Sequence, residues 1–136
     1  MGFIGYNAKR EELAYIAGLL DGEGCIQING DKYSMNINIR NTVKAPLEFV
    51  EGILGGSIHS YLPKRGYICY TWRLCGAKAA IVLGFLLPYL IIKKERAILA
   101  IEFVSVPDKY RKDEIRLEMT VLNRRWTPLL DLREED

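Results

Sequence analysis

The chain has 136 residues, 49% of them hydrophobic, and a formal net charge of +2. This length suffices for one hydrophobic core and not for two full domains, so we expect a single domain over residues 1–136. The longest uncharged run, Ala79 to Ile92, falls short of the roughly 20 apolar residues that a membrane span needs, and three cysteines with one histidine offer no structural zinc site.

The first predicted element is a helix that starts near Lys9. Its apolar residues recur at i, i+3, i+4 and i+7, at Leu13, Ile16, Ala17 and Leu20. The opposite face is no more polar, so we expect this helix to be buried on both sides. Gly22 and Gly24 are expected to end it, because glycine tolerates the left-handed backbone that often follows a helix.

Two segments that alternate apolar and polar residues follow, at 25–29 and 35–40, separated by a turn at 30–32. This pattern predicts a β-hairpin with one apolar and one polar face. The expected core residues are Ile26, Ile28, Ile37 and Ile39. The residues expected on the opposite face are Gln27, Asn29, Asn36, Asn38 and Arg40.

A short helix and a second hairpin come next. Asn41 and Thr42 resemble a helix start, and Gly55 and Gly56 its end, with a buried stripe at Leu47, Val50 and Leu54. Strands are then predicted at 57–62 and 67–74, around a turn at 63–66 that carries Lys64 and Arg65. The expected core residues are Ile58, Ile68, Tyr70, Trp72 and Leu74, and the outward residues are His59, Tyr61, Tyr67, Thr71 and Arg73.

Helices are predicted for the rest of the chain. The first runs from Gly76 through Leu87, the second has Pro88 in its first turn and reaches about Val104, and the last spans about 113–125. An acidic tail is expected at about 131–136. The resulting helix-β-β-helix-β-β-helix order predicts an α+β fold, with a mainly antiparallel four-stranded sheet and helices on one face.

The segment from Ile16 to Gly24, IAGLLDGEG, places two carboxylates, Asp21 and Glu23, at a helix C-terminus. The negative end of the helix dipole disfavours a carboxylate there by up to about 1 kcal/mol, which invites a cation, and oxygen ligands suit Mg²⁺. Small residues would let two such helices approach closely and bring two Glu23 side chains together. These expected interface residues are Ala14, Ala17, Gly18 and Gly22.

This segment resembles the signature of the LAGLIDADG homing endonucleases, with Ile, Leu, Gly and Glu in place of the first Leu, the Ile, the second Ala and the second Asp. The order of elements over about residues 10–125 matches the family as well. A single signature implies the homodimeric branch, in which each subunit supplies one signature helix and one saddle-shaped sheet. The resemblance implies an intron-encoded enzyme that cuts both strands of a long, near-palindromic DNA site with Mg²⁺ or Mn²⁺, and an intracellular, DNA-associated location.

The resemblance also implies roles for individual residues. Glu23 would bind the metal together with the carbonyl of Gly22, whereas Asp21 would be a structural carboxylate that stabilises the helix end. Lys93 would lie near the reacting phosphate, with Lys94 as the alternative. Asn41 would orient solvent beside the metal, with Arg40 as the alternative.

The outward residues of the two hairpins form the expected DNA-binding surface. Asn, Gln, Arg and Tyr are rich in groups that bind base edges, and a two-stranded ribbon fits the major groove. The region from Ser57 to Lys112 supports this interpretation, since it holds ten lysines and arginines against three acids. The alternative to a DNA-binding surface is a sheet face that is polar only because it faces solvent.

Two other functions stay open at this stage. One is a binding module on the same fold that does not cleave, such as an intron RNA splicing cofactor (maturase) or a DNA-binding regulator; the presence of Glu23 and Lys93 argues against it. The other is an unrelated oligomeric α+β protein whose first helix is only a dimer interface. Salt-sensitive DNA binding would exclude that second alternative.

Overall fold

The computed structural model describes residues 7–29 and 33–124. Its four strands form one antiparallel sheet in the order β1-β2-β4-β3, with bounds β1 (Gly24–Asn29), β2 (Ser34–Asn41), β3 (Ser57–Tyr61) and β4 (Cys69–Cys75). The helices are α1 (Arg10–Glu23), α2 (Ala45–Leu54), α3 (Gly76–Leu86), the 3₁₀ helix η1 (Leu87–Tyr89), α4 (Lys94–Ser105) and α5 (Lys109–Arg124). The α+β class, the antiparallel sheet and the element order are confirmed. The turn expected at 30–32 and the tail expected at 131–136 lie outside the described residues.

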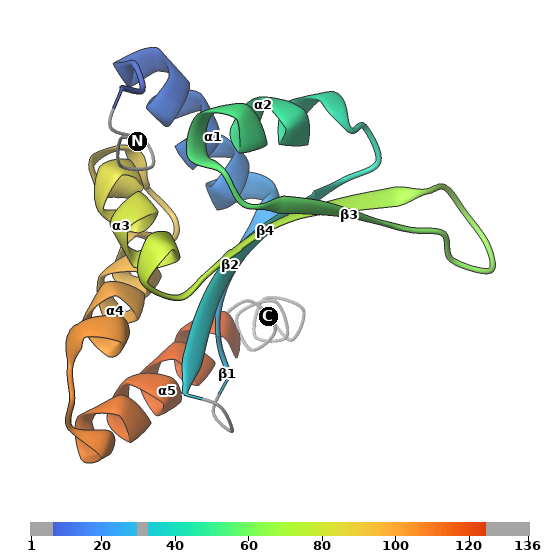
Figure 1. The fold of residues 1–136 in the computed structure, drawn as a ribbon. Helices are drawn as coiled ribbons and strands as arrows, with labels where there is room; N and C mark the ends of the chain where they lie inside the picture. Colours follow the sequence, from blue (N-terminus) through green and yellow to red (C-terminus); the bar gives the residue numbers. More distant parts are fainter. Residues whose placement is uncertain (1–6, 30–32, 125–136) are drawn as a thin grey trace, which may run out of the picture.

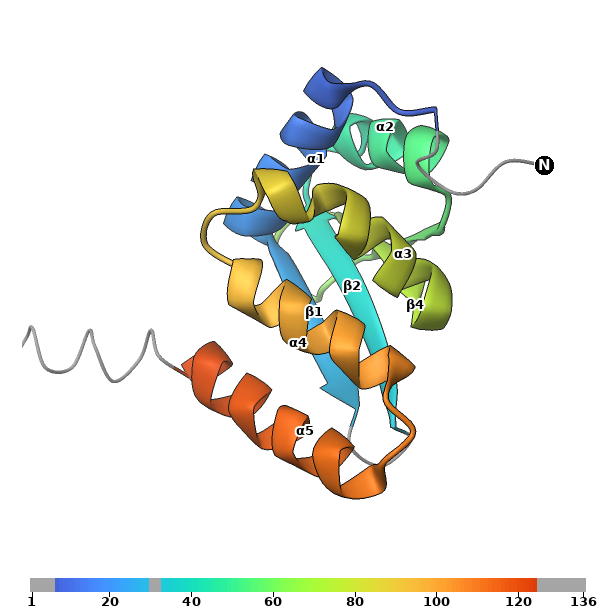
Figure 2. The ribbon, with the colours of Figure 1, turned by 90° about the vertical axis from the view of Figure 1, so that its left-hand side faces the viewer.

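The sheet is strongly curved, and helices α1 to α4 cover one of its faces (Figure 1). Figure 2 shows α1, α3 and α4 in front of β1 and β2. The apolar side chains of both layers meet in one core, in which Trp72 and Phe103 are the largest fully buried side chains. Helix α5 packs against α4 and the edge strand β1. No helix in the described part of the chain is long and apolar enough to cross a membrane.

Helix α1 does not end in a glycine with left-handed backbone, as was predicted. Gly22 lies within the helix, and Gly24 is extended, at φ −106° and ψ 179°. A Cβ at Gly24 would lie 2.5 Å from Leu20 Cδ1 and 2.9 Å from the Asn38 carbonyl oxygen. The position therefore needs glycine because the helix end passes closely over β2, and the chain enters β1 directly.

Helix α2 begins at Ala45, not at the predicted Asn41 and Thr42. Asn41 is the last residue of β2, and Pro46 sits in the first turn of the helix, where its fixed φ and missing N–H are tolerated. The predicted buried stripe of Leu47, Val50 and Leu54 is confirmed.

Pro88 does not start a long helix. It lies in the 3₁₀ helix η1 that follows α3, the chain is extended at Leu90, and α4 begins only at Lys94. The last helix also begins earlier than predicted, at Lys109. In the second hairpin, Tyr67 and Ile68 precede β4, and Ile68 is 43% exposed where a core residue was predicted.

Candidate active site and nucleic-acid interface

Glu23 and Asn41 meet where α1 and β2 end. Glu23 is exposed, and Asn41 Nδ2 donates a hydrogen bond to Glu23 Oε1 at 3.1 Å. Asn41 Oδ1 accepts one from the backbone N–H of Val43 at 2.8 Å, which fixes the orientation of the amide. Arg40, the alternative to Asn41, lies opposite Thr71 in β4. The carboxylate and the amide predicted to act together are thus in direct contact.

Asp21 lies two residues before Glu23 in α1 and binds the segment that leads into α4. Its Oδ2 accepts hydrogen bonds from the backbone N–H groups of Ile91 (2.8 Å) and Ile92 (3.2 Å), and its Oδ1 accepts one from Lys93 (3.0 Å). These three N–H groups precede α4, since Lys93 is its N-cap residue. Asp21 therefore has a structural role, but it holds the segment between η1 and α4 rather than the end of its own helix.

Lys93 folds back toward the end of α1, and its Nζ donates to the carbonyl oxygen of Asp21 at 2.6 Å. Burial lowers the pKa of Lys93 below its usual 10.5, and the positive charge of Arg96 adds to this effect. Electrostatic interactions with Asp21 and, to a smaller extent, with Cys25 oppose this lowering in part. Lys94, the alternative, is exposed as the first residue of α4. The cation in contact with the end of α1 is therefore Lys93.

Three of the four predicted interface residues share one exposed face of α1. Ala14, Gly18 and Gly22 are exposed, and a Cβ at either glycine would meet no atom within 4 Å. The expectation that α1 is buried on both sides is therefore wrong for one chain. The prediction that Ala17 belongs to the interface is also wrong, since Ala17 is fully buried in the core.

An aromatic pair borders the exposed face of α1. The rings of Tyr15 and Phe49 meet edge to face, with centroids 5.3 Å apart, and both side chains are exposed. Phe49 was not identified from the sequence as a surface residue. Its position on α2 outside the buried stripe would have indicated this. Exposed aromatic pairs of this kind are frequent at protein interfaces.

The uncovered face of the sheet is a polar grid, because residues opposite one another in paired strands point to the same face. The strand register places polar side chains in rows across the sheet: Gln27, Asn36 and Cys75; Cys25, Asn38, Arg73 and Ser57; Arg40, Thr71 and His59; Cys69 and Tyr61. The three cysteines and Ser57 were not predicted on this face, although the same alternation, carried to the strand ends, places them there.

Most residues predicted to bind DNA are accessible, on this face or in the loop between β3 and β4. Exposed side chains are those of Gln27, Asn29, Arg40, His59, Tyr61, Lys64, Arg65, Tyr67 and Arg73, and the half-buried ones are those of Asn36 and Thr71. Asn38 differs. It is 6% exposed, and its Nδ2 donates to Gln27 Oε1 (3.2 Å) and Asn36 Oδ1 (3.1 Å), so it orients its neighbours. The loop with Lys64 and Arg65 projects away from the body of the molecule (Figure 1).

Solved structures with the same arrangement of elements are homing endonucleases. The homing endonuclease I-CvuI in complex with its target Sro1.3, in the presence of 2 mM Ca, matches with a TM-score of 0.65 and 21% identity over 82% of each chain. I-CvuI with the I-CreI target C1221, in the presence of 2 mM Mg with the DNA not cleaved, matches with a TM-score of 0.60 and 22% identity over 83% of this chain and 78% of that one. The archaeal intron-encoded homing endonuclease I-Vdi141I, complexed with DNA, matches with a TM-score of 0.64 and 18% identity over 82% and 84%.

The chain has the homing-endonuclease fold. No protein-family model and no curated protein matches its sequence. Within this homing-endonuclease fold, the predicted residues form two connected groups. Glu23, Asn41 and Lys93 gather around the end of α1, and the polar grid begins at the next residues of β1.

The donor set at the end of α1 fits a divalent ion only in part. The Glu23 carboxylate and the neighbouring carbonyl of Gly22 are the hard oxygen donors that Mg²⁺ prefers. Within residues 7–29 and 33–124, however, no three His, Cys, Asp or Glu side chains come together as a metal site. In the part of the chain that the structure describes, the end of α1 therefore offers one exposed carboxylate, that of Glu23.

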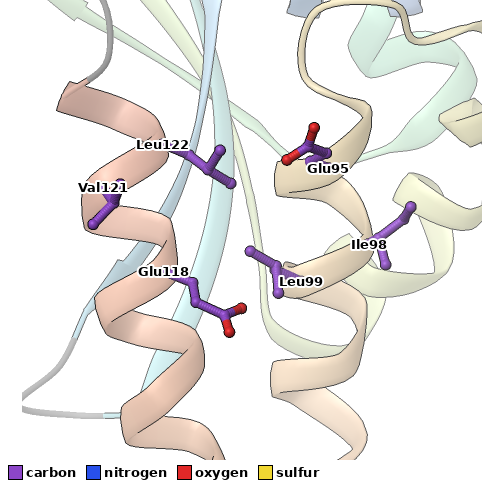
Figure 3. A pocket seen from close by; sticks show the side chains of 6 residues that line it. All are labelled: Glu95, Ile98, Leu99, Glu118, Val121 and Leu122. Atoms are coloured by element: carbon purple, nitrogen blue, oxygen red, sulfur yellow. The ribbon is translucent and has the colours of Figure 1, made fainter.

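An apolar hollow of about 420 Å³ lies elsewhere in the molecule, between α4 and α5. Leu99 points from α4 toward α5, and Glu118 and Leu122 point from α5 toward α4 (Figure 3). Its two ionisable lining residues are acids, Glu95 and Glu118, which would repel phosphate groups. This hollow shares no residue with the cluster around Glu23.

Proposed function

We propose that the chain is a LAGLIDADG homing endonuclease of the single-motif branch, which cuts both strands of a long, near-palindromic DNA site as a metal-dependent homodimer. One observation carries the proposal. At the end of α1 an exposed carboxylate, Glu23, lies against an amide, Asn41, and close to a partly buried cation, Lys93. This group lies at the border of an open polar sheet, in the fold of homing endonucleases bound to DNA.

The exposed face of α1 supports the homodimer. Glycine in a helix interior costs about 1 kcal/mol relative to alanine. Gly18 and Gly22 have open space around them, so nothing in the described part of one chain requires a missing side chain there. Close packing of a second α1 explains both glycines, because only small residues let two helix backbones approach one another. Such packing brings Glu23 of the two subunits together.

Glu23 and the Gly22 carbonyl of each subunit would hold Mg²⁺ or Mn²⁺. When bound, such an ion neutralises phosphate charge and acidifies water near the scissile bond. Asn41 holds the Glu23 carboxylate in place and orients adjacent solvent through its amide. Lys93 supplies a positive charge that stabilises the negative charge developing on the phosphate.

The polar grid is the DNA-reading surface of this proposal. Its exposed amides, guanidinium groups and phenols match the donors and acceptors of the major groove. The basic loop at Lys64 and Arg65, between β3 and β4, projects away from the body of the molecule (Figure 1) and would contact the phosphate backbone beyond the sheet. Two such sheets related by a two-fold axis would read a near-palindromic site.

Cleavage of a DNA library with randomised inserts tests the function. Wild type with Mg²⁺ should enrich one near-palindromic site, and Glu23→Gln should bind that site without cutting it. Glu11→Gln, which removes an exposed carboxylate from the first turn of the same helix, should cut like wild type. If the wild-type protein binds DNA or a structured intron RNA without cutting it, the nuclease proposal is wrong and the non-cleaving binding module takes its place.

A further inference from the structure

The sheet and α5 enclose a polar hollow of about 480 Å³ that the sequence did not predict. It is lined by side chains from β1, β2, β4 and α5: Gln27, Ile28, Asn29, Asn36, Arg73, Arg116, Met119, Thr120 and Asn123. Several of them belong to the polar grid. The hollow therefore continues the grid from the sheet onto α5.

The chemistry of this lining suits an anion. None of the nine lining residues is acidic, two are arginines, and four carry side-chain amides with N–H donors. Asp113 approaches Arg116 at 4.0 Å, and it accepts a hydrogen bond from the Tyr33 hydroxyl at 3.1 Å. An ion pair of this length on an accessible surface contributes little to stability, so the Arg116 guanidinium remains available to bind an anion.

Arg116 also has unused hydrogen-bonding capacity. Its Nε is buried and has no hydrogen-bond partner among the described residues. An unpaired buried donor costs free energy, and most such groups in proteins find a partner. A planar guanidinium matches the oxygens of a phosphate group better than any other side chain does.

We propose that this hollow binds a phosphodiester of the DNA backbone, with Arg116 of α5 as the principal contact. The inference rests on the proposed function, because the anion is part of the DNA that the sheet reads. A strand rises about 3.3 Å per residue, so the Asn29 end of the hollow lies about 20 Å along β1 from Glu23. At 3.4 Å per base pair this corresponds to about six base pairs, in the outer part of each half-site.

The position of α5 is fixed well enough for this role. Arg111 makes a two-pronged ion pair with Glu102 of α4, at 2.7 and 2.9 Å, and Ile115 and Met119 are buried in the core. A phosphate contact on a fixed helix sets the position of the protein on the duplex and reads no sequence.

Salt-dependent binding to the site selected by wild type tests the proposal. Arg116→Gln should bind about tenfold more weakly at low salt and should lower the slope of log Kd against log salt by about 0.9, the value for one lost phosphate contact. A scrambled duplex should lose affinity by the same factor, because the contact carries no sequence information. Arg124→Gln, which removes the same charge from α5 outside the hollow, should bind like wild type.

The outcomes are distinguishable. If Arg116→Gln and Arg124→Gln keep the wild-type slope, or lower it equally, the phosphate site in the hollow is wrong while the proposed function stands. If wild type itself binds no DNA, both fail. Asn123→Asp, a change at an exposed position that adds a negative charge to the hollow, should weaken binding as well, and thermal unfolding followed by circular dichroism checks that each variant is folded.

Discussion

Asn41 donates a hydrogen bond from Nδ2 to Glu23 Oε1 at 3.1 Å and thereby joins the end of β2 to the end of α1. The two residues are 18 positions apart, and a Cβ at Gly24 would not fit between the helix end and β2. The contact thus depends on the close passage of α1 over the sheet. It holds the only carboxylate that each chain contributes to the proposed reaction at a defined orientation.

Asn41→Ala should lower the single-turnover cleavage rate by about 10- to 100-fold, because a catalytic group that loses its orientation costs rate on that scale. Affinity for the selected site should change little, since Asn41 lies at the border of the polar grid. Rapid-quench kinetics at saturating protein, with gel-shift binding in Ca²⁺, separate the two effects. Thr42→Ala, at the exposed neighbouring position, is the matched control; cleavage by Asn41→Ala at the rate of this control would contradict the role of Asn41.

Asp21→Ala should destabilise the protein by about 2 kcal/mol, the scale expected when hydrogen-bonded backbone groups lose their acceptor. Three backbone N–H groups, those of Ile91, Ile92 and Lys93, lose their acceptor in this variant. Asp21→Asn keeps one side-chain oxygen and should lie between wild type and Asp21→Ala. Urea unfolding measures the order of the three proteins, and equal midpoints would show that Asp21 does not anchor this segment.

Cleavage should fall at alkaline pH before the usual lysine pKa is reached. Burial lowers the pKa of Lys93 below 10.5, so its ammonium loses the proton as pH rises through that lowered value, and the charge that stabilises the phosphate disappears. Lys93→Arg cannot lose its charge in this range and should keep its own, lower rate to higher pH. If the pH profiles of wild type and Lys93→Arg coincide, the alkaline limb does not belong to Lys93.

Gly18→Leu should leave each chain folded and prevent dimer formation. A side chain at Gly18 meets open space within one chain, and leucine has a higher helix propensity than glycine. A leucine at this position would, however, hold two α1 helices apart. Gly84→Leu is the control, because Gly84 of α3 is also exposed and surrounded by open space. Sedimentation velocity should give monomers for Gly18→Leu and dimers for Gly84→Leu; dimers for both would place the interface elsewhere.

The strands and the buried stripes could be predicted because they depend on local periodicity. Alternation between Cys25 and Arg40 defines two strands and their apolar face, and the stripe on α2 follows from spacing alone. Asn38 shows the limit of this reasoning: alternation places it on the polar face, but only the neighbouring strands bury it. Ala17 differs, because the apolar stripe of α1 already indicated its burial and only its assignment to the interface was wrong.

The helix ends could not be predicted because they depend on contacts distant in sequence. Helical structure ends with η1 at Tyr89 and resumes as α4 at Lys94, and backbone N–H groups of the segment in between are bound by Asp21, about 70 residues earlier. The hollow at Arg116 likewise requires α5 to lie beside β1, which no local pattern of α5 indicates.

The central claim, that two copies of Glu23 act together across a dimer, is tested most directly by mixing wild-type chains with Glu23→Gln chains. The two are refolded together in equal amounts and assayed on the selected site at constant total protein. Random pairing makes about one quarter of the dimers fully wild type, so double-strand cleavage should fall to about one quarter of the unmixed value. A fall to only about three quarters would show that a dimer with one Glu23 suffices, and a fall to about one half would show that each chain cuts on its own; either result would contradict the paired site.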